Sequence, residues 1–423
     1  MKLKEIIYEM RHQPVMTWVS ITGTALAIFL IMVVVMLAQV KVLPFSPESN
    51  RDRWLVNNAF SIGNKEWTGK SNGAMSYETA KELYYNMEVP EEVTLFDNWD
   101  QFCTLSLPDH TRVNADKCET DDRFWNVMDF TFIDGSPYDR AEFESGQPVA
   151  VLCESIAKKL FGTTEASGRH FSLNHVDYTV KGVVKDVSPL ATHAYAQVWI
   201  PFTSSTVVDF TWCNGIMGPL KAIILAKDKS DFPEVRREFL ERHKAFFKNL
   251  EDNGFFYEQL HRPYTQEVSA YTTGAASAPD MESEYRERFI TFAILLLVPA
   301  INLSSMTHSR LRRQRETIGI RRAFGATKRK VFNSLLAENM IITLVAGIIG
   351  LIATVIFFYL AQDSLFQASS YATGKANFHI GMAMSWSTFG WALLFCFLLN
   401  LLSAGLPAFQ ASRVNIVNAL SKK

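Results

Sequence analysis

The sequence predicts an α-helical membrane protein with four transmembrane helices and a mixed α/β domain outside the cytoplasm. The chain has 423 residues, of which 48% are apolar. Four long runs of these residues contain no charge at all. A long segment, residues 41–288, lies between the first and second runs. It is rich in charged residues, as a soluble domain is.

Each of the four runs is long enough to cross a bilayer. A spanning helix needs about 20 mostly apolar residues, because the hydrocarbon core is about 30 Å thick. Pro299 predicts a kink in the second run. The first run is longer than the core of a signal peptide, about 7–15 residues, and no A-x-A cleavage site follows it. We therefore expect it to remain as a membrane helix.

The distribution of Lys and Arg predicts the orientation, because these residues concentrate in short cytoplasmic segments. Three precede the first run, nine lie within residues 307–333, three follow the last run, and the loop 362–388 carries only Lys375. Both termini are therefore expected inside. The predicted organisation is a cytoplasmic segment 1–14, a span 15–40, an external domain 41–288, a span 289–306, a cytoplasmic loop 307–339, a span 340–361, an external loop 362–388, a span 389–409 and a cytoplasmic tail 410–423.

The external segment is acidic and long enough to bury a core of its own, as two lobes. It holds 26 Lys and Arg against 38 Asp and Glu, a net charge of −12. Such a surface argues against binding nucleic acid or anionic lipid. Alternation and turn residues predict strands at 149–153, 170–173, 178–184, 196–202 and 221–226, a helix at 155–161 closed by Gly162, a helix from an N-cap at Ser230 to about Leu250, and a flexible connection at 269–279.

The cysteines leave one pairing open. There are five, and none forms a CxxC motif. Four lie in the external segment, where disulfides are permitted. Cys103 and Cys118 are nearest in sequence and form a candidate disulfide, with free or buried thiols as the alternative. Cys153 and Cys213 have no evident partner.

No catalytic or metal site emerges from the pattern. Residues 63–71 resemble a phosphate-binding loop, but five residues separate their glycines where the motif needs four. Ser155 and Lys158 have the S-x-x-K spacing of serine acyl-enzymes without the accompanying K-T-G. The histidines at 170, 175 and 193 have no spacing that fixes a metal site. We expect a protein that is not an enzyme and that binds no cofactor or metal itself.

The basic loop carries the most specific signal. Ile320, Phe324, Val331 and Leu335 fall near one helical face, which predicts an amphipathic helix. Interfacial anchoring would explain that face, but it leaves Gly319 and Gly325 unexplained, since each glycine costs a helix about 1 kcal/mol relative to Ala. Glycines suit a turn between two short helices or a close approach to a partner. We therefore interpret this loop as a docking element.

The same loop resembles a known family. Its pattern Glu316-x-Ile318-Gly319-Ile320-Arg321-Arg322-Ala323-x-Gly325-Ala326 is similar to the cytoplasmic loop of the FtsX/MacB-type (type VII) ABC transporter permeases. The segments 299–302 and 407–413 and Glu338 have family counterparts, although Asn415-Ile416 stands where the family often has Asn-Pro. In the external domain, segments 132–135, 149–152, 159–162 and 178–184, with Gly168, are similar to the MacB periplasmic core domain. Residues 50–127 and 202–278 carry little of the pattern.

The resemblance implies a division of labour. A dimeric cytoplasmic ABC ATPase, which binds ATP and magnesium, would act on a pair of permeases, either two copies of this chain or this chain and a related one. Only about 14 residues precede the first span, so the ATPase is expected on a separate chain. The implied ATPase-coupling residues are Glu316, Ile318, Gly319, Ile320, Arg321, Arg322, Ala323, Phe324, Gly325 and Ala326.

The resemblance also implies a location and two rival functions. The chain would lie in the bacterial inner membrane, in contact with lipid, with its large domain in the periplasm. It would transmit movement to that domain, called mechanotransmission, and help to export or extract a peptide, drug or lipoprotein, with a periplasmic adaptor and an outer-membrane channel as further partners. The alternative is an FtsX-like regulator of a periplasmic partner such as a cell-wall hydrolase. The size of the external domain favours the first.

Overall fold

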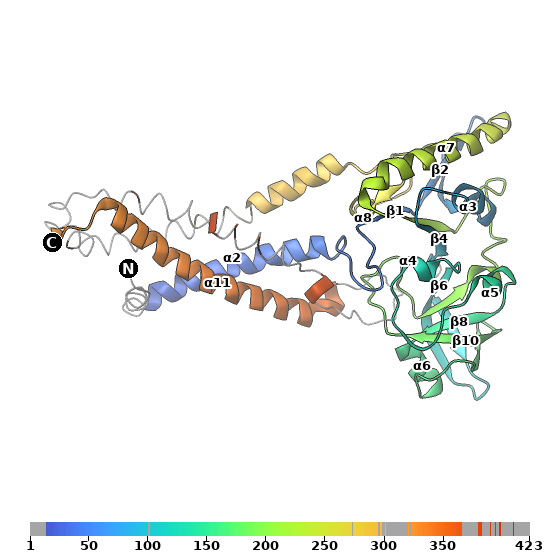
Figure 1. Cartoon of the computed structure of the whole chain (residues 1–423), viewed down its shortest axis with the longest axis horizontal. Coiled ribbons are helices and arrows are strands. Elements are labelled where there is room, and N and C mark those ends of the chain that lie inside the picture. Colours follow the sequence, from blue (N-terminus) through green and yellow to red (C-terminus); the bar gives the residue numbers. More distant parts are fainter. Residues whose placement is uncertain are drawn as a thin grey trace. The chain divides into compact units, whose positions relative to one another are not determined.

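The computed structural model describes most of the external domain and two long helices. The described residues are 14–99, 102–272, 274–294, 297, 301, 320, 323–365, 380–382, 390, 394, 397–398 and 409. The chain divides into two compact units (Figure 1). A helical unit contains Met1–Gln39, Glu282–Ala361 and Ala383–Lys423, and an external unit contains Val40–Met281 and Gln362–Met382.

Two helices dominate the described part of the helical unit. They are α2 (Pro14–Gln39) and α11 (Lys328–Leu365). Within them, Thr17–Gln39 and Met340–Gln362 are long and apolar enough to cross a membrane, and both coincide with predicted spans. Residues 281–294 are also helical. The predicted spans 289–306 and 389–409 lie largely outside the described residues.

Small residues let α2 and α11 approach closely. A Cβ added to Gly350 would lie 2.7 Å from the backbone oxygen of Ala25 and 3.1 Å from Ile28 Cβ. Ile21 and Ala25 pack there against Ile342 and Ala346, as expected for helix pairs that associate through small residues. Gly350 therefore allows the close packing of α2 against α11 within one chain.

The external unit contains a closed ring of six strands. In order they are β6 (Arg112–Thr120), β5 (Phe102–Ser106), β9 (His170–Leu173), β10 (Val176–Val184), β8 (Val149–Cys153) and β11 (Val198–Pro201). The ring closes because β11 pairs both with β8 and, in parallel, with β6. Closure removes exposed strand edges, which would otherwise pair with other chains.

A branch and a second sheet extend from this ring. From β6 the large sheet continues through β4 (Glu92–Asp97), β13 (Lys221–Leu225), β1 (Trp54–Asn57) and β15 (Tyr264–Thr265), and β7 (Phe132–Gly135) pairs with β10. The second sheet has the order β12 (Met217–Gly218), β3 (Lys70–Met75), β2 (Phe60–Asn64) and β14 (Phe255–Tyr257). The remaining elements are α3 (Tyr77–Tyr84), α4 (Phe124–Val127), α5 (Arg140–Glu144), α6 (Glu154–Phe161), α7 (Phe232–Leu250), α8 (Gln266–Ala270) and the 3-10 turns η1 (Phe202–Ser204), η2 (Lys229–Asp231), η3 (Glu251–Asn253) and η4 (Ile380–Met382).

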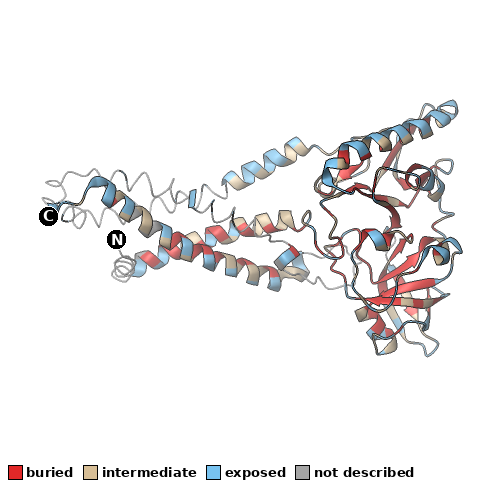
Figure 2. Cartoon of the chain, viewed as in Figure 1, coloured by how far each residue is buried: buried red, intermediate tan, exposed pale blue. Residues whose placement is uncertain are grey.

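One apolar core joins the second sheet to strands β1 and β13 of the large sheet. Phe60 and Phe255 of the second sheet cluster with Leu55 and Ile224 of the large sheet and with Phe239 of α7. All five side chains are buried. Figure 2 shows buried residues concentrated on the strands, while α7 keeps an exposed outer face.

Most of the predicted external elements are confirmed. The strand and helix around residues 149–161 are β8 and α6, and Gly162 ends α6 in the left-handed conformation at φ 72°. The hairpin is β9 and β10. The predicted helix cap at Ser230 is wrong, because Ser230 lies in η2, whose N-cap is Asp228, and α7 begins only at Phe232. The predicted flexible connection begins inside a helix, since α8 runs to Ala270.

The predicted disulfide is also wrong. Cys103 and Cys118 are both buried and form no disulfide with each other. Cys103 lies opposite Ala115 on β6, and Cys118 is three residues further along that strand, about 10 Å away at the usual strand rise. Because Ala115 and Cys118 are an odd number of residues apart on β6, their side chains also point to opposite faces of the sheet. A disulfide needs Cα atoms within about 7 Å, so this pairing cannot form.

Candidate functional site

The described part of the predicted docking loop is a tight turn between two helical segments. Phe324 N donates to Ile320 O at 3.0 Å, which is the last turn of a helix. Gly325 follows with φ 90°, a conformation that glycine adopts without strain. Thr327 then caps the next helix, α11, because its Oγ1 accepts from Lys330 N at 3.2 Å. The interpretation of Gly325 as a residue of a turn is confirmed.

The turn presents an exposed aromatic side chain. Phe324 is 89% exposed and Ile320 is 44% exposed, whereas Val331 is buried. The predicted continuous amphipathic face from Ile320 to Leu335 is therefore wrong, because the helix is interrupted at the turn. Of the predicted coupling residues, Ile320, Ala323, Phe324, Gly325 and Ala326 are described; Glu316, Ile318, Gly319, Arg321 and Arg322 lie outside the described residues.

From this turn α11 runs without interruption for 38 residues. At about 1.5 Å per residue such a helix is about 57 Å long. It begins in the basic loop and contains the whole predicted span 340–361. A single helix therefore joins the exposed turn to the other end of that span.

A second feature, which the sequence analysis did not predict, holds the start of the external unit. The segment that follows α2, residues 40–43, is bound by the guanidinium of Arg51. Its Nη1 donates to the backbone oxygens of Val40 at 3.0 Å and Leu43 at 3.1 Å. Its Nη2 donates to Leu190 O at 2.7 Å, in the loop before β11. One side chain thus joins two segments that are far apart in sequence.

Glu48 neutralises this buried cation. Its Oε2 accepts from Arg51 Nε at 2.6 Å, and both side chains are completely buried. Its Oε1 accepts from the backbone nitrogens of His193 at 2.7 Å and Ala194 at 2.9 Å. Burial alone would raise the pKa of Glu48, but the charge of Arg51 and these hydrogen bonds hold it below its usual value. We call Glu48, Arg51 and residues 40–43 the buried clamp.

His193 and Gln266 extend the buried clamp. The His193 ring packs edge-on against Trp54, with ring centroids 5.8 Å apart, and burial lowers the pKa of His193 to about 4. Trp54 Nε1 donates to Gln266 Oε1 at 3.0 Å, and Gln266 Nε2 donates to Lys41 O at 3.0 Å. The backbone at Lys41 therefore has its own side-chain tether. The only sequence signal was two opposite charges, three residues apart, soon after a span.

Two helices long and apolar enough to cross a membrane, an exposed turn in a basic loop and a large α/β unit are the features of a membrane protein with a folded extramembrane domain. Comparison with known families agrees with this class. Residues 17–242 match the MacB-like periplasmic core domain, and residues 289–416 match the FtsX-like permease C-terminal domain. The chain belongs to the MacB/FtsX-type ABC transporter permeases, a family of inner-membrane proteins with a periplasmic core domain.

Individual relatives are distant. The chain is 21% identical over 303 residues to the uncharacterized ABC transporter permease YknZ of Bacillus subtilis, covering 71% of this chain and 68% of that protein. It is 23% identical over 317 residues to the macrolide export ATP-binding/permease protein MacB of Nitrobacter winogradskyi, covering 73% of this chain and 44% of MacB. The chain therefore spans less than half the length of MacB.

One solved structure among the similar ones is the periplasmic region of MacB from Actinobacillus actinomycetemcomitans. It has a TM-score of 0.33 and 16% identity, and the match covers 48% of this chain and 89% of that one.

Proposed function

We propose that this chain is a permease subunit that couples ATP hydrolysis by a separate cytoplasmic ATPase to movement of its periplasmic domain. The observation that carries the proposal is the exposed turn at Phe324, which directly precedes α11 in the chain. An aromatic side chain that is almost fully exposed beside Ile320 suits insertion into a pocket on a partner, as buried aromatic anchors do in protein interfaces. Membership in the permease family supports an ABC ATPase as that partner.

α11 offers a route for the movement. Since α11 begins directly after the turn and contains the whole predicted span, a displacement of the turn would move the span as a rod. The tight contact of Gly350 with Ala25 would pass that displacement to α2. The segment directly after α2 is held by the buried clamp. Because α2 packs against α11 and the segment after α2 is held by the buried clamp, α2 would transmit movement better than a helix joined by a flexible linker.

The cargo is proposed to be exported or extracted at the periplasmic side, as a peptide, drug or lipoprotein. The name of the relative MacB, macrolide export protein, supports export. The complex would contain an ATPase dimer with bound ATP and magnesium, a second permease copy, and an adaptor and outer-membrane channel. The alternative, an FtsX-like regulator that transports nothing, is not favoured, because residues 17–242 match the MacB-like periplasmic core domain.

Affinity purification of the full chain in mild detergent, followed by mass spectrometry, tests the partner. We expect an ABC ATPase to co-purify and its ATP hydrolysis to change when the permease is present. Recovery of the intact permease without any ATPase, at native expression levels and in low salt, would contradict the proposal. Recovery of a cell-wall hydrolase in place of transport partners would favour the regulator instead.

A further inference from the structure

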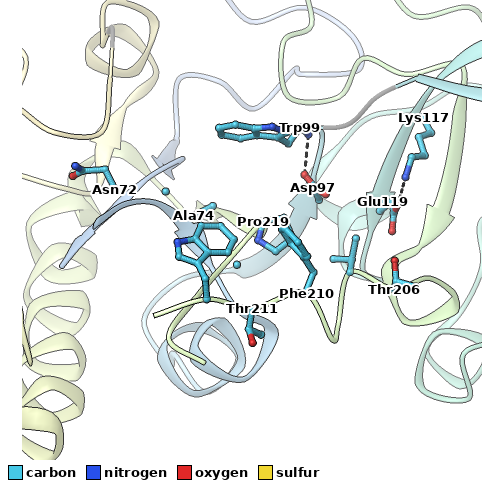
Figure 3. Close-up of a pocket in the computed structure, with 14 residues that line it drawn as sticks. Asn72, Ala74, Asp97, Trp99, Lys117, Glu119, Thr206, Phe210, Thr211 and Pro219 are labelled. Carbon is cyan, nitrogen blue, oxygen red and sulfur yellow. Dashed lines mark hydrogen bonds and ion pairs between the residues drawn. The ribbon is translucent and has the colours of Figure 1, made fainter. Parts of the chain in front are cut away.

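A pocket of about 670 Å³ opens between the two sheets of the external unit. Its volume lies within the range of about 300–1,000 Å³ typical of small-molecule sites. One side is formed by β3 and β12 of the second sheet, and the other by β6 and the end of β4 of the large sheet. Residues 206–212, which follow η1, line the remainder. Figure 3 shows Trp99, Asp97 and Phe210 around the same opening.

The walls of this pocket carry unusually exposed aromatic rings. Trp99 is 75% exposed and Phe210 is 60% exposed. Phe210 packs against Trp212, with ring centroids 5.7 Å apart. The backbone makes room for Trp212, since a Cβ on Gly73 would lie 2.7 Å from its ring atom Cζ2. Large apolar groups left facing solvent at a concave site mark a binding surface more often than a packing defect.

The same pocket contains a buried carboxylate, and the charges of Lys221 and Lys117 act on it from nearby. Asp97 is 8% exposed, and its Oδ1 accepts from Trp99 N at 2.8 Å. None of the cations that the structure describes forms an ion pair with it. Lys117 pairs with Glu119, and Lys221 Nζ donates to Asn98 Oδ1 at 2.5 Å. The lining therefore carries Asp97, Glu119 and Lys117, a net charge of −1.

We propose that this aromatic pocket binds an amphipathic organic cation, with its apolar body against Trp99 and Phe210 and its charged group at Asp97. Aromatic faces attract cations through the ring quadrupole, and the attraction grows when water is excluded. A cation in the pocket would also give Asp97 the direct ion pair that neither Lys117 nor Lys221 forms with it. This inference concerns a ligand site in the external unit and does not depend on the proposed ATPase coupling.

The pH dependence follows from Asp97. Burial raises the pKa of its carboxyl to about 6, with Glu119 acting in the same direction, and Lys221 and Lys117 opposing it. The carboxylate is mostly ionised at pH 7.5 and mostly protonated at pH 5. Affinity for a cation is therefore expected to fall as the pH drops through about 6.

A pair of probes of matched shape and opposite charge tests the site. Tetraphenylphosphonium and tetraphenylborate are titrated into the purified full-length protein, and binding is followed by quenching of tryptophan fluorescence. We expect saturable binding of the cation only, at least tenfold weaker in Asp97→Asn and in Phe210→Ala. Asp177→Asn, an exposed carboxylate on β10, serves as the matched control and should bind as the unaltered chain does.

Two outcomes would overturn the proposal. One is equal affinity for the two probes. The other is unchanged cation affinity in both Asp97→Asn and Phe210→Ala while their thermal unfolding shows that they are folded. Asp97→Asn keeps the shape and the acceptor oxygen of the side chain, and Phe210 is mostly exposed, so neither change threatens the fold. Retention of ATPase stimulation in these variants would separate this site from the proposed coupling.

Discussion

Arg51 and Glu48 form a 2.6 Å ion pair with both side chains completely buried. The side-chain hydrogen bonds of the pair go to backbone groups or to the partner charge, so the two charges are compensated inside the fold. Burying an ion pair contributes little net stability, but removing one partner leaves a bare charge in the interior. The pair therefore matters most for where it lies, at the start of the external unit directly after α2.

Replacing Arg51 by Met should strongly destabilise the external unit. Glu48 would remain buried without its counter-charge, which typically costs about 3–5 kcal/mol. Chemical denaturation of the full chain in detergent, followed by tryptophan fluorescence, measures the loss. Arg237→Met is the control, because its ion pair with Glu234 is more than half exposed on both sides and should contribute less than about 1 kcal/mol. Equal effects of the two changes would argue against the buried clamp.

His193 should make the external unit sensitive to acid. Its pKa is lowered to about 4 by burial, from an ordinary value of 6.5. Between these values the unfolded chain binds a proton that the native state does not, so native stability falls as pH drops from about 6.5 to 4. His193→Gln should remove this part of the pH dependence. The exposed His170→Gln should leave it unchanged, and a similar flattening in both variants would contradict the assignment.

The contact between α2 and α11 should tolerate an added methyl group at Gly347 but not at Gly350. At Gly350 an added Cβ meets the backbone oxygen of Ala25 at 2.7 Å, whereas at Gly347 it meets only Ile28 Cδ1 at 3.8 Å. Gly350→Ala should therefore destabilise the helix pair by about 1–3 kcal/mol, as overpacking does. Gly347→Ala should be neutral. Thermal unfolding of both variants in detergent measures the two effects. A larger loss of stability in Gly347→Ala than in Gly350→Ala would show that the helices cross elsewhere.

The external thiols should be free without any reductant. Cys103 and Cys118 are buried and form no disulfide with each other, and burial raises the pKa of Cys153 to about 12. We expect iodoacetamide to leave Cys103, Cys118 and Cys153 unmodified in the native protein. After denaturation without a reductant, we expect it to alkylate all three. Intact-mass measurement checks both. A mass that gains two further alkyl groups only after reduction would mean that a disulfide exists.

Sequence patterns identified the elements whose signals are local. The apolar run 149–153, the helix closed by Gly162 and the alternation around Tyr178 each depend on neighbouring residues, and the structure contains all three. Gly325 was identified for the same reason, since a glycine within helix-forming residues predicts a turn.

Features built from distant segments were not predictable in this way. The ring closes through parallel pairing of residues 117–120 with 198–201, and nothing in either strand specifies its partner. The buried clamp joins Arg51 to Leu190, and the aromatic pocket joins Asp97 to the loop around Phe210. Nearness in sequence misled the disulfide prediction, because register and strand alternation place Cys103 and Cys118 apart.

The most direct test of the central claim is ATPase coupling through the turn at Phe324. The full chain and its Phe324→Asp variant are purified with the associated ATPase, and both the bound ATPase and the rate of ATP hydrolysis are measured. We predict that Phe324→Asp loses most of the ATPase while remaining inserted and folded, and that Val176→Asp, an equivalent change on the external unit at a half-exposed position, keeps it. Undiminished ATPase binding and hydrolysis in Phe324→Asp would contradict the account.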